Sequence, residues 1–249
     1  MIRYDSIGHG YAQTRREDPA IRDAIARHLG DAQSVLNVGA GTGSYEPTDR
    51  HVLAVEPSQV MAAQRPPHRA PAIRARAGAL PLHDASVDAA MSVLSLHHWD
   101  EERERGVREM RRVARGPVVL VTYDPELSGA MWLMRDYLPE VAELDRRTFP
   151  SMTDLAHWLG GRVSIEPLPI RRDTPDWNLG SFWAHPERVL DEAARRATSG
   201  FARMSPEVVD RVVTAVRRDL DSGAWDRQNG HLRQLEACDV GLRVVAATP

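Results

Sequence analysis

Three glycines and one acid carry the chemistry that is easiest to read in this sequence. Gly39, Gly41 and Gly43 directly follow a short apolar run, and Glu56 directly follows a second one. A chain that leaves a strand this abruptly needs residues that tolerate positive φ and lack a Cβ, so that backbone can lie against a ligand. A carboxylate at the end of the next strand can accept hydrogen bonds from the two hydroxyls of a ribose. The pattern predicts a nucleotide or nucleoside site at the carboxyl ends of parallel strands.

The glycine spacing separates two kinds of cofactor. A dinucleotide site has its third glycine three positions after the second, where this chain has Ser44. It also holds pyrophosphate on a helix N-terminus, yet the short, Pro47-containing segment between Gly43 and the next strand has room for about one turn. A ribose-containing cofactor without phosphate fits better. An NAD-dependent oxidoreductase and a glycine turn without any ligand are the alternatives.

Short apolar runs that alternate with helical periodicity predict the frame around this loop. Strands are expected at 34–38, 51–55, 72–77, 87–94 and 117–122, and helices at 19–30 and 101–114. Such alternation is typical of a doubly wound, mostly parallel α/β sheet. Residues 162–168 and 242–247 are expected to be the last two strands, an antiparallel pair at one edge. Between them, helices at 186–196 and 206–220 would form an insertion of about sixty residues, a candidate lid, because a structureless loop of that length is improbable.

The order and spacing of three segments resemble a known family. VLNVGAGTG, AVEPS and ALPLHDASVDAAMSVLSLHHW, within residues 33–122, are similar to the motifs of class I S-adenosylmethionine-dependent methyltransferases, most of all the ubiquinone/menaquinone-biosynthesis (type 11) group. The resemblance implies a Rossmann-like seven-stranded sheet with an antiparallel edge strand and S-adenosyl-L-methionine as cofactor. Residues 1–124 would then form an N-terminal lid and the cofactor-binding core, residues 125–235 a helical cap for the substrate interleaved with one core strand, and residues 236–249 the last strand.

The same resemblance assigns cofactor-binding roles along the first half of the chain. It implies that the glycines line the methionine and ribose parts, that Glu56 holds the ribose, and that an N-terminal stretch folds over the cofactor. The cofactor-binding residues expected on this basis are Tyr11, Arg15, Asn37, Gly39, Ala40, Gly41, Gly43, Glu56, Pro57, Ser58, Met61, Ala77, Gly78 and Ser95. Surface residues on an exposed helix are the alternative for Tyr11 and Arg15.

Two positions depart from the family pattern. Asn37 stands where the family usually has an acid, and Arg76 where this group often has Asp. Asn37 can hydrogen-bond the amino-acid part of the cofactor but supplies no charge to its ammonium group. Arg76 cannot accept a hydrogen bond from the adenine amino group. The segment after the first strand is also unusually short, which would open that side of the site.

Methyl transfer from a sulfonium is an in-line displacement that depends mainly on positioning and on the exclusion of water. A base is needed only if the acceptor must lose a proton, and His97, ahead of His98, is the expected base because histidine titrates near neutral pH. Packing and helix capping are the alternative roles of this pair. The chain shows no third ligand for a metal ion. Substrate-binding residues are expected among the aromatic and arginine side chains Tyr4, Trp99, Trp132, Arg135 and Trp183.

Composition narrows the class of protein. The net charge is −3, every one of the 32 basic residues is Arg, and no basic stripe suggests a nucleic-acid partner. The single Cys238 and the absence of a long apolar run predict a cytoplasmic protein without a membrane span. The expected function is methylation of an O, N or C atom of a small molecule. Methylation of tRNA or protein, and cofactor binding without methyl transfer, are the rival functions, and a homodimer is left open.

Overall fold

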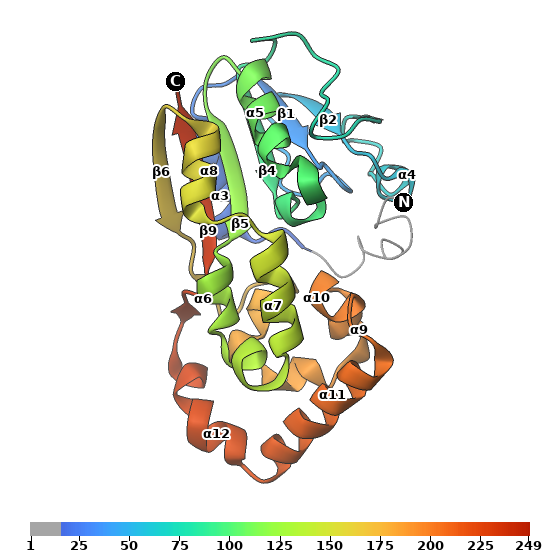
Figure 1. The fold of residues 1–249 in the computed structure, drawn as a ribbon, viewed down its shortest axis with the longest axis vertical. Helices are drawn as coiled ribbons and strands as arrows, with labels where there is room; N and C mark the ends of the chain where they lie inside the picture. The colour runs from blue at the N-terminus through green and yellow to red at the C-terminus, as the bar shows by residue number, and fades with distance from the viewer. Residues whose placement is uncertain (1–15) are drawn as a thin grey trace.

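A seven-stranded sheet forms the centre of the computed structural model, which describes residues 16–249 (Figure 1). Its strands are β1 (Ser34–Val38), β2 (His51–Val55), β3 (Ala72–Ile73), β4 (Ala89–Val93), β5 (Val118–Tyr123), β6 (Arg162–Pro167) and β9 (Leu242–Thr248). They lie in the order β3-β2-β1-β4-β5-β9-β6, with β9 antiparallel to both of its neighbours and the other pairs parallel. The doubly wound sheet with an antiparallel edge is therefore confirmed.

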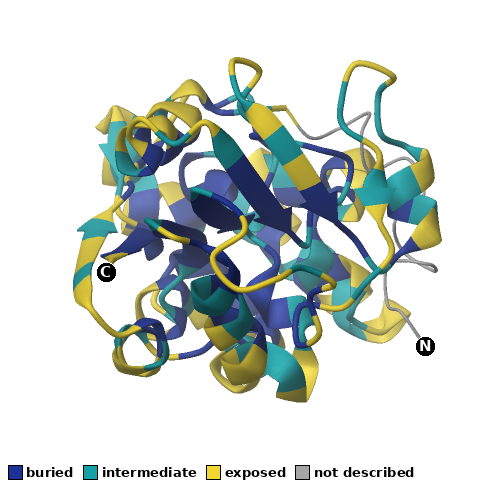
Figure 2. Ribbon diagram, turned by 90° about the horizontal axis from the view of Figure 1, so that it is seen from above, coloured by how far each residue is buried: buried dark blue, intermediate teal, exposed yellow. Residues whose placement is uncertain are grey.

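Apolar residues on both faces of the strands explain why helices cover both sides of the sheet. On one face Val119 of β5 packs with Ile21 and Ile25 of α3 (Pro19–Leu29). On the other, Leu120 packs with helices α5 (Arg103–Val113) and α8 (Met152–Leu159), which lie in front of the sheet in Figure 1. Figure 2 shows buried residues along the central strands and exposed ones on the surrounding helices and loops.

The connection from β1 to β2 consists of turns and bends, as its length predicts. Between β2 and β3 the chain forms the short helix α4 (Gln59–Ala63). This edge of the sheet is consequently less covered, and Leu53 and Ile73 are 37% and 38% exposed. The third strand is also shorter than expected, because it pairs with β2 through Ala72 and Ile73 alone.

A helical region, which we call the cap (residues 125–148 and 179–234), follows the carboxyl end of β5 and lies below the sheet in Figure 1. Its elements are α6 (Pro125–Gly129), η3 (Leu133–Tyr137), α7 (Pro139–Thr148), η4 (Leu179–Ala184), η5 (Pro186–Val189), α9 (Glu192–Arg196), α10 (Ser199–Ala202), α11 (Pro206–Asp221), α12 (Ala224–Asn229) and η6 (Gly230–Gln234). A second small sheet pairs β7 (Ile170–Arg171) with β8 (Ala237–Cys238). Two short 3-10 turns, η1 (Leu96–His98) and η2 (Asp100–Glu102), follow β4.

The single helix expected at residues 186–196 of the cap is divided into two short helices, η5 and α9. Residues 186–196 break after Val189, because the Asp191 side chain accepts hydrogen bonds from the backbone N–H groups of Ala193 and Ala194 and thereby begins a new helix. The helix expected at 206–220 is present as α11.

The cap and the α3 face of the sheet share one hydrophobic core. Trp132, Trp183 and Trp225 of the cap belong to the same buried cluster as Ile25 and Val121. The cap is thus packed as a continuation of the sheet. Within residues 16–249 no helix is both long and apolar enough to cross a membrane.

Candidate cofactor and active site

A cavity of about 490 Å³ lies at the carboxyl ends of β1, β2 and β4. The strand order reverses between β1 and β4, and ligands of open α/β sheets bind at such a point. The volume of the cavity falls in the range of small-molecule sites, about 300–1,000 Å³. The cavity is lined by the glycine loop, by residues at and after the ends of β2, β3 and β4, by Arg16, and by Asp176, which precedes the second part of the cap.

The glycine loop presents bare backbone to this cavity. Gly39 has a φ of 70° and Gly41 a φ of 51°, and both line the cavity. A Cβ on Gly39 would lie 2.4 Å from Ser95 Oγ, so no larger residue fits there without displacing Ser95, which follows β4. Gly43, with a φ of 92°, faces Arg65, Arg69 and Glu46 and is not a lining residue.

Glu56 lines the cavity and is held in one orientation by two hydrogen bonds. Its side chain is buried, one carboxylate oxygen accepts from Gly41 N–H at 2.8 Å, and the other accepts from Ser58 N–H at 2.8 Å. A carboxylate oxygen has more than one acceptor site. Glu56 can therefore accept the hydroxyls of a ribose while it fixes the glycine loop.

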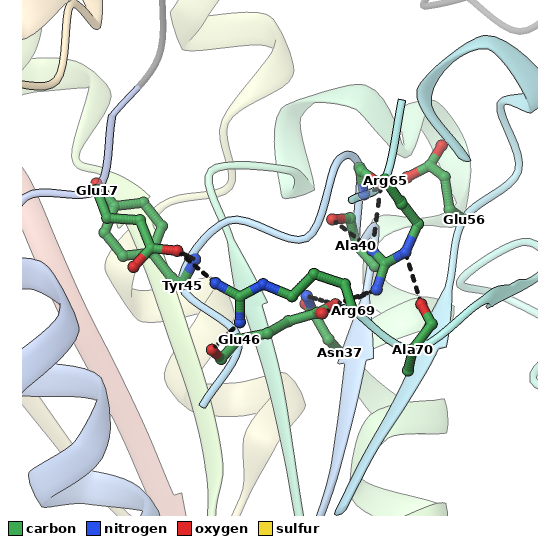
Figure 3. A network of polar contacts seen from close by, with 10 residues as sticks. Glu17, Asn37, Ala40, Tyr45, Glu46, Glu56, Arg65, Arg69 and Ala70 are labelled. Atoms are coloured by element: carbon green, nitrogen blue, oxygen red, sulfur yellow. Dashed lines mark hydrogen bonds and ion pairs between the residues drawn. The ribbon is translucent and has the colours of Figure 1, made fainter. Parts of the chain in front are cut away.

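A buried ion pair supports the loop from behind (Figure 3). Arg65 Nη2 contacts the two carboxylate oxygens of Glu46 at 2.9 and 2.8 Å, and its Nη1 donates to the carbonyl oxygens of Ala40 and Gly41 at 3.4 and 3.3 Å. The two charged side chains are 4% and 1% exposed. Asn37 Nδ2 donates to Glu46 at 3.0 Å. This hydrogen bond explains why position 37 is an amide, because an acid there would be repelled by the Glu46 carboxylate.

Three residues other than glycine adopt positive φ at the cavity wall: Tyr45, Leu94 and Asp100, the last with a φ of 48°. Tyr45 has a φ of 64° and Leu94 a φ of 50°. Strained residues of this kind persist where the surroundings hold them, often at functional sites. Tyr45 is held at both ends: its N–H donates to Glu17 at 2.8 Å, and its hydroxyl donates to Asp176 at 3.3 Å and accepts from Asp18 N–H at 3.0 Å. The glycine loop is thereby fastened to the segment that leads into η4.

The expected adenine side is assembled from three short segments. Pro57, Met61 and Ala77 line the cavity. Ser58 caps α4 through a hydrogen bond from Met61 N–H, and Gly78 lies against Glu102; neither is a lining residue. Arg76 lines the cavity, and its guanidinium lies 3.9 Å from the Glu102 carboxylate.

The two neighbouring histidines, His97 and His98, have different surroundings. His98 lines the cavity beside Ser95 and Trp99, whereas His97 is not a lining residue and stacks on Phe149 with ring centroids 4.4 Å apart. The two imidazole centroids are 3.7 Å apart. Among the described residues, no group of three or more His, Cys, Asp or Glu side chains is arranged to hold a metal ion.

Three of the residues expected to bind the acceptor do not reach this cavity. Trp132 and Trp183 are 2% and 1% exposed in the shared core, where Trp132 Nε1 donates to the Trp183 carbonyl oxygen at 2.9 Å. Arg135 instead pairs with Asp136 at 2.7 Å, which raises its pKa. Tryptophan fills a core as readily as a pocket, and residue type alone does not separate the two. Tyr4, Tyr11 and Arg15 lie outside the described residues.

Twelve lining residues were not among the predicted site residues, and four of these twelve matter most for the site. Arg16 stands next to the expected Arg15, and Leu94 and Tyr45 stand next to expected segments, so proximity was the available signal. Asp176 has no local signal, because it reaches the glycine loop from 131 positions away.

Comparison with known proteins places this geometry in a family. The methyltransferase domain profile matches residues 36–121. A solved structure from Anabaena variabilis ATCC 29413, described as a methyltransferase from an antibiotic biosynthesis pathway, is 32% identical, with a TM-score of 0.86 over 95% of this chain and 100% of that chain. None of the curated proteins matches.

Two further solved structures share the fold at lower identity. Geranyl diphosphate C-methyltransferase from Streptomyces coelicolor A3(2), in complex with Mg²⁺, geranyl diphosphate and S-adenosyl-L-homocysteine, is 15% identical with a TM-score of 0.53 over 92% of this chain and 78% of that one. Phosphoethanolamine N-methyltransferase 2 from Haemonchus contortus, in complex with S-adenosyl-L-methionine, is 15% identical with a TM-score of 0.56 over 93% of this chain and 53% of that one.

Proposed function

Because this chain belongs to the class I S-adenosylmethionine-dependent methyltransferases of the type 11 group, we propose that it methylates an O, N or C atom of a small molecule. The observation that carries the proposal is the cavity at the switch point of the sheet, where the backbone of Gly39 and Gly41 and the Glu56 carboxylate face the same space. The full-length likeness to the Anabaena protein supports it further.

The residues present fit the cofactor. S-adenosylmethionine, when bound, supplies a methyl group on a positively charged sulfur. Glu56 would hold the ribose, the bare backbone at Gly39 and Gly41 leaves room for the chain that carries the sulfur, and Pro57, Met61 and Ala77 would enclose the adenine. Arg76 cannot accept from the adenine amino group, so the adenine would depend on stacking or on another acceptor on that side.

The protein's part in catalysis is mainly to position the acceptor and to exclude water. Ser95, His98 and Trp99 follow β4 and line the wall of the cavity near Gly39, where they would receive the acceptor. We assign His98 as the base for an acceptor that carries a hydroxyl, because its imidazole borders the cavity, whereas His97 packs on Phe149. For an acceptor that is already a nucleophile, His98 would act through contact alone.

Several features favour a small acceptor over a macromolecule. The net charge of −3 provides little attraction for nucleic acid. The cap continues the hydrophobic core of the sheet beside the cavity. The Anabaena relative is described as part of an antibiotic biosynthesis pathway, which is small-molecule chemistry.

Incubation of the protein with methyl-labelled S-adenosylmethionine and a fractionated cell extract tests the proposal. We expect label in a low-molecular-weight organic fraction and stoichiometric S-adenosylhomocysteine. Label in RNA or protein would support the macromolecular alternative and refute ours. Cofactor binding without turnover in any fraction would also count against methyl transfer.

Once an acceptor is known, His98→Gln and His97→Gln form a matched pair that tests the base. For a hydroxyl acceptor we expect His98→Gln to lower kcat by about 10²–10⁴-fold and to remove the limb of the pH profile near neutrality. His97→Gln should retain that limb. The reverse pattern would overturn the assignment of His98.

A further inference from the structure

At the end of the cavity opposite the expected adenine side, the family's usual acid is missing. The residues that replace it can be identified from the charges of the proposed cofactor, an inference that rests on the proposed function. The methionine part of S-adenosylmethionine is a zwitterion, with an ammonium and a carboxylate group. Position 37, where the family usually supplies an acid, is Asn37, and its amide nitrogen is bonded to Glu46. Glu46 itself pairs with Arg65 and is not a lining residue. Neither position therefore offers a carboxylate to the ammonium group.

Among the described lining residues, the acids other than Glu56 fall into two places. Asp100, Glu101 and Glu102 form η2, and the Glu102 side chain lies against Gly78 on the expected adenine side. Asp176 lies at the other end, where its Oδ2 accepts from the Tyr45 hydroxyl at 3.3 Å. Asp176 is thus the described acid that borders the cavity where the methionine part would lie.

The fold holds Asp176 firmly. Its side chain is 1% exposed, Asn178 Nδ2 also donates to Oδ2 at 3.3 Å, and its own N–H donates to Thr174 Oγ1 at 3.3 Å. Asn178 in turn accepts from the Tyr123 hydroxyl at the end of β5 at 2.7 Å. These bonds fix a carboxylate from the segment between β7 and η4 against a loop far away in the sequence.

A cation borders the same end. Arg16 and Arg76 are the arginines among the described lining residues. Arg76 lies near Glu102 on the expected adenine side. Arg16 precedes Glu17, whose carboxylate accepts from Tyr45 N–H, and it therefore lies at the Tyr45 end.

We propose that Asp176 binds the α-ammonium group of the cofactor and Arg16 its α-carboxylate. The negative charge that β1 lacks at Asn37 is then supplied by Asp176, from the segment that leads into η4. Charge-assisted hydrogen bonds of this kind are about twice as strong as neutral ones.

Calorimetric titration with three ligands tests both residues. S-adenosylhomocysteine carries both charged groups, its decarboxylated analogue S-adenosyl-3-thiopropylamine keeps only the ammonium, and 5′-methylthioadenosine has neither. For Asp176→Asn we expect the affinity for the first two ligands to fall by about 10- to 100-fold, the loss of a hydrogen bond to a charged group. The affinity for 5′-methylthioadenosine should stay unchanged.

For Arg16→Gln only S-adenosylhomocysteine should bind more weakly. The control is Asp173→Asn, which removes an exposed carboxylate of the same segment that pairs with Arg171; it should leave all three affinities unchanged. Equal losses for all three ligands in Asp176→Asn would show a merely structural role and overturn the inference, as would no loss at all. A parent protein that ignores S-adenosylhomocysteine would instead refute the proposed function.

Discussion

Removal of Arg65 should destabilise the protein far more than removal of an arginine in an otherwise similar ion pair on the surface. Arg65 and Glu46 lie 2.8 Å apart with side chains 4% and 1% exposed. Arg108 and Glu104 also lie 2.8 Å apart, but each is 52% exposed. The residue types and distances match, so the two pairs differ in burial and in the backbone carbonyl oxygens that Arg65 also bonds.

The magnitudes follow from that difference. An exposed i,i+4 pair contributes about 0.3–0.5 kcal/mol, so Arg108→Leu should be nearly neutral. Arg65→Leu leaves the Glu46 carboxylate buried without its main partner, which costs about 3–5 kcal/mol. For a chain of this size the melting temperature should fall by roughly 6–20 °C in Arg65→Leu and by about 1–2 °C in Arg108→Leu.

Urea denaturation followed by circular dichroism measures both free energies of unfolding. Titration with S-adenosylhomocysteine adds a second readout, because Arg65 also donates to the Ala40 and Gly41 carbonyl oxygens and its loss should weaken binding. The double variant Arg65→Leu/Glu46→Gln removes the orphaned charge and should recover part of the lost stability. If Arg65→Leu and Arg108→Leu differ by less than about 1 kcal/mol, the reasoning on burial is refuted.

Three further outcomes follow from single positions. Gly39→Ala should fold but lose most of its affinity for S-adenosylhomocysteine, since the new Cβ would lie 2.4 Å from Ser95 Oγ at a φ of 70°; calorimetry with undiminished binding would contradict this. Burial raises the pKa of Asp145 to about 7 in the folded protein, so this group makes stability fall as the pH rises from about 4 towards 7. Asp145→Asn should therefore raise the melting temperature at pH 8 but not at pH 4, and equal shifts at both would exclude the explanation. Trp132→Phe, which loses the hydrogen bond to the Trp183 carbonyl, should cost about 1–2 kcal/mol in urea denaturation and leave the affinity for S-adenosylhomocysteine unchanged.

Most of the sheet could be predicted from local pattern. The first two strands end where predicted, because each apolar run is bounded by glycine or by Glu56 and Pro57. The antiparallel pair β6 and β9 was predictable for the same reason, although it is joined by a long insertion. Within the insertion, proline marked where helices begin, but the break at Asp191 depends on a side-chain cap that periodicity does not reveal.

In the candidate site too, residues set by local sequence could be predicted, whereas residues brought in by tertiary contacts could not. The glycine loop and Glu56 were predictable because a local backbone requirement dictates residue type at adjacent positions. Asp176 was not, because its meeting with Tyr45 depends on how the cap returns to the sheet. Asn37 departs from the family pattern in the sequence, and the departure is explained only by the structure, in which Asn37 contacts the buried Glu46–Arg65 pair.

Calorimetric titration of the parent protein and of Glu56→Gln with S-adenosylhomocysteine tests the central claim most directly. The amide of Gln would direct N–H groups at either Gly41 N–H or Ser58 N–H, whose bonds the carboxylate now accepts. We expect the parent to bind the nucleoside and Glu56→Gln to bind it at least about ten-fold more weakly. A parent that does not bind S-adenosylhomocysteine, or a variant that binds it equally well, would contradict the account.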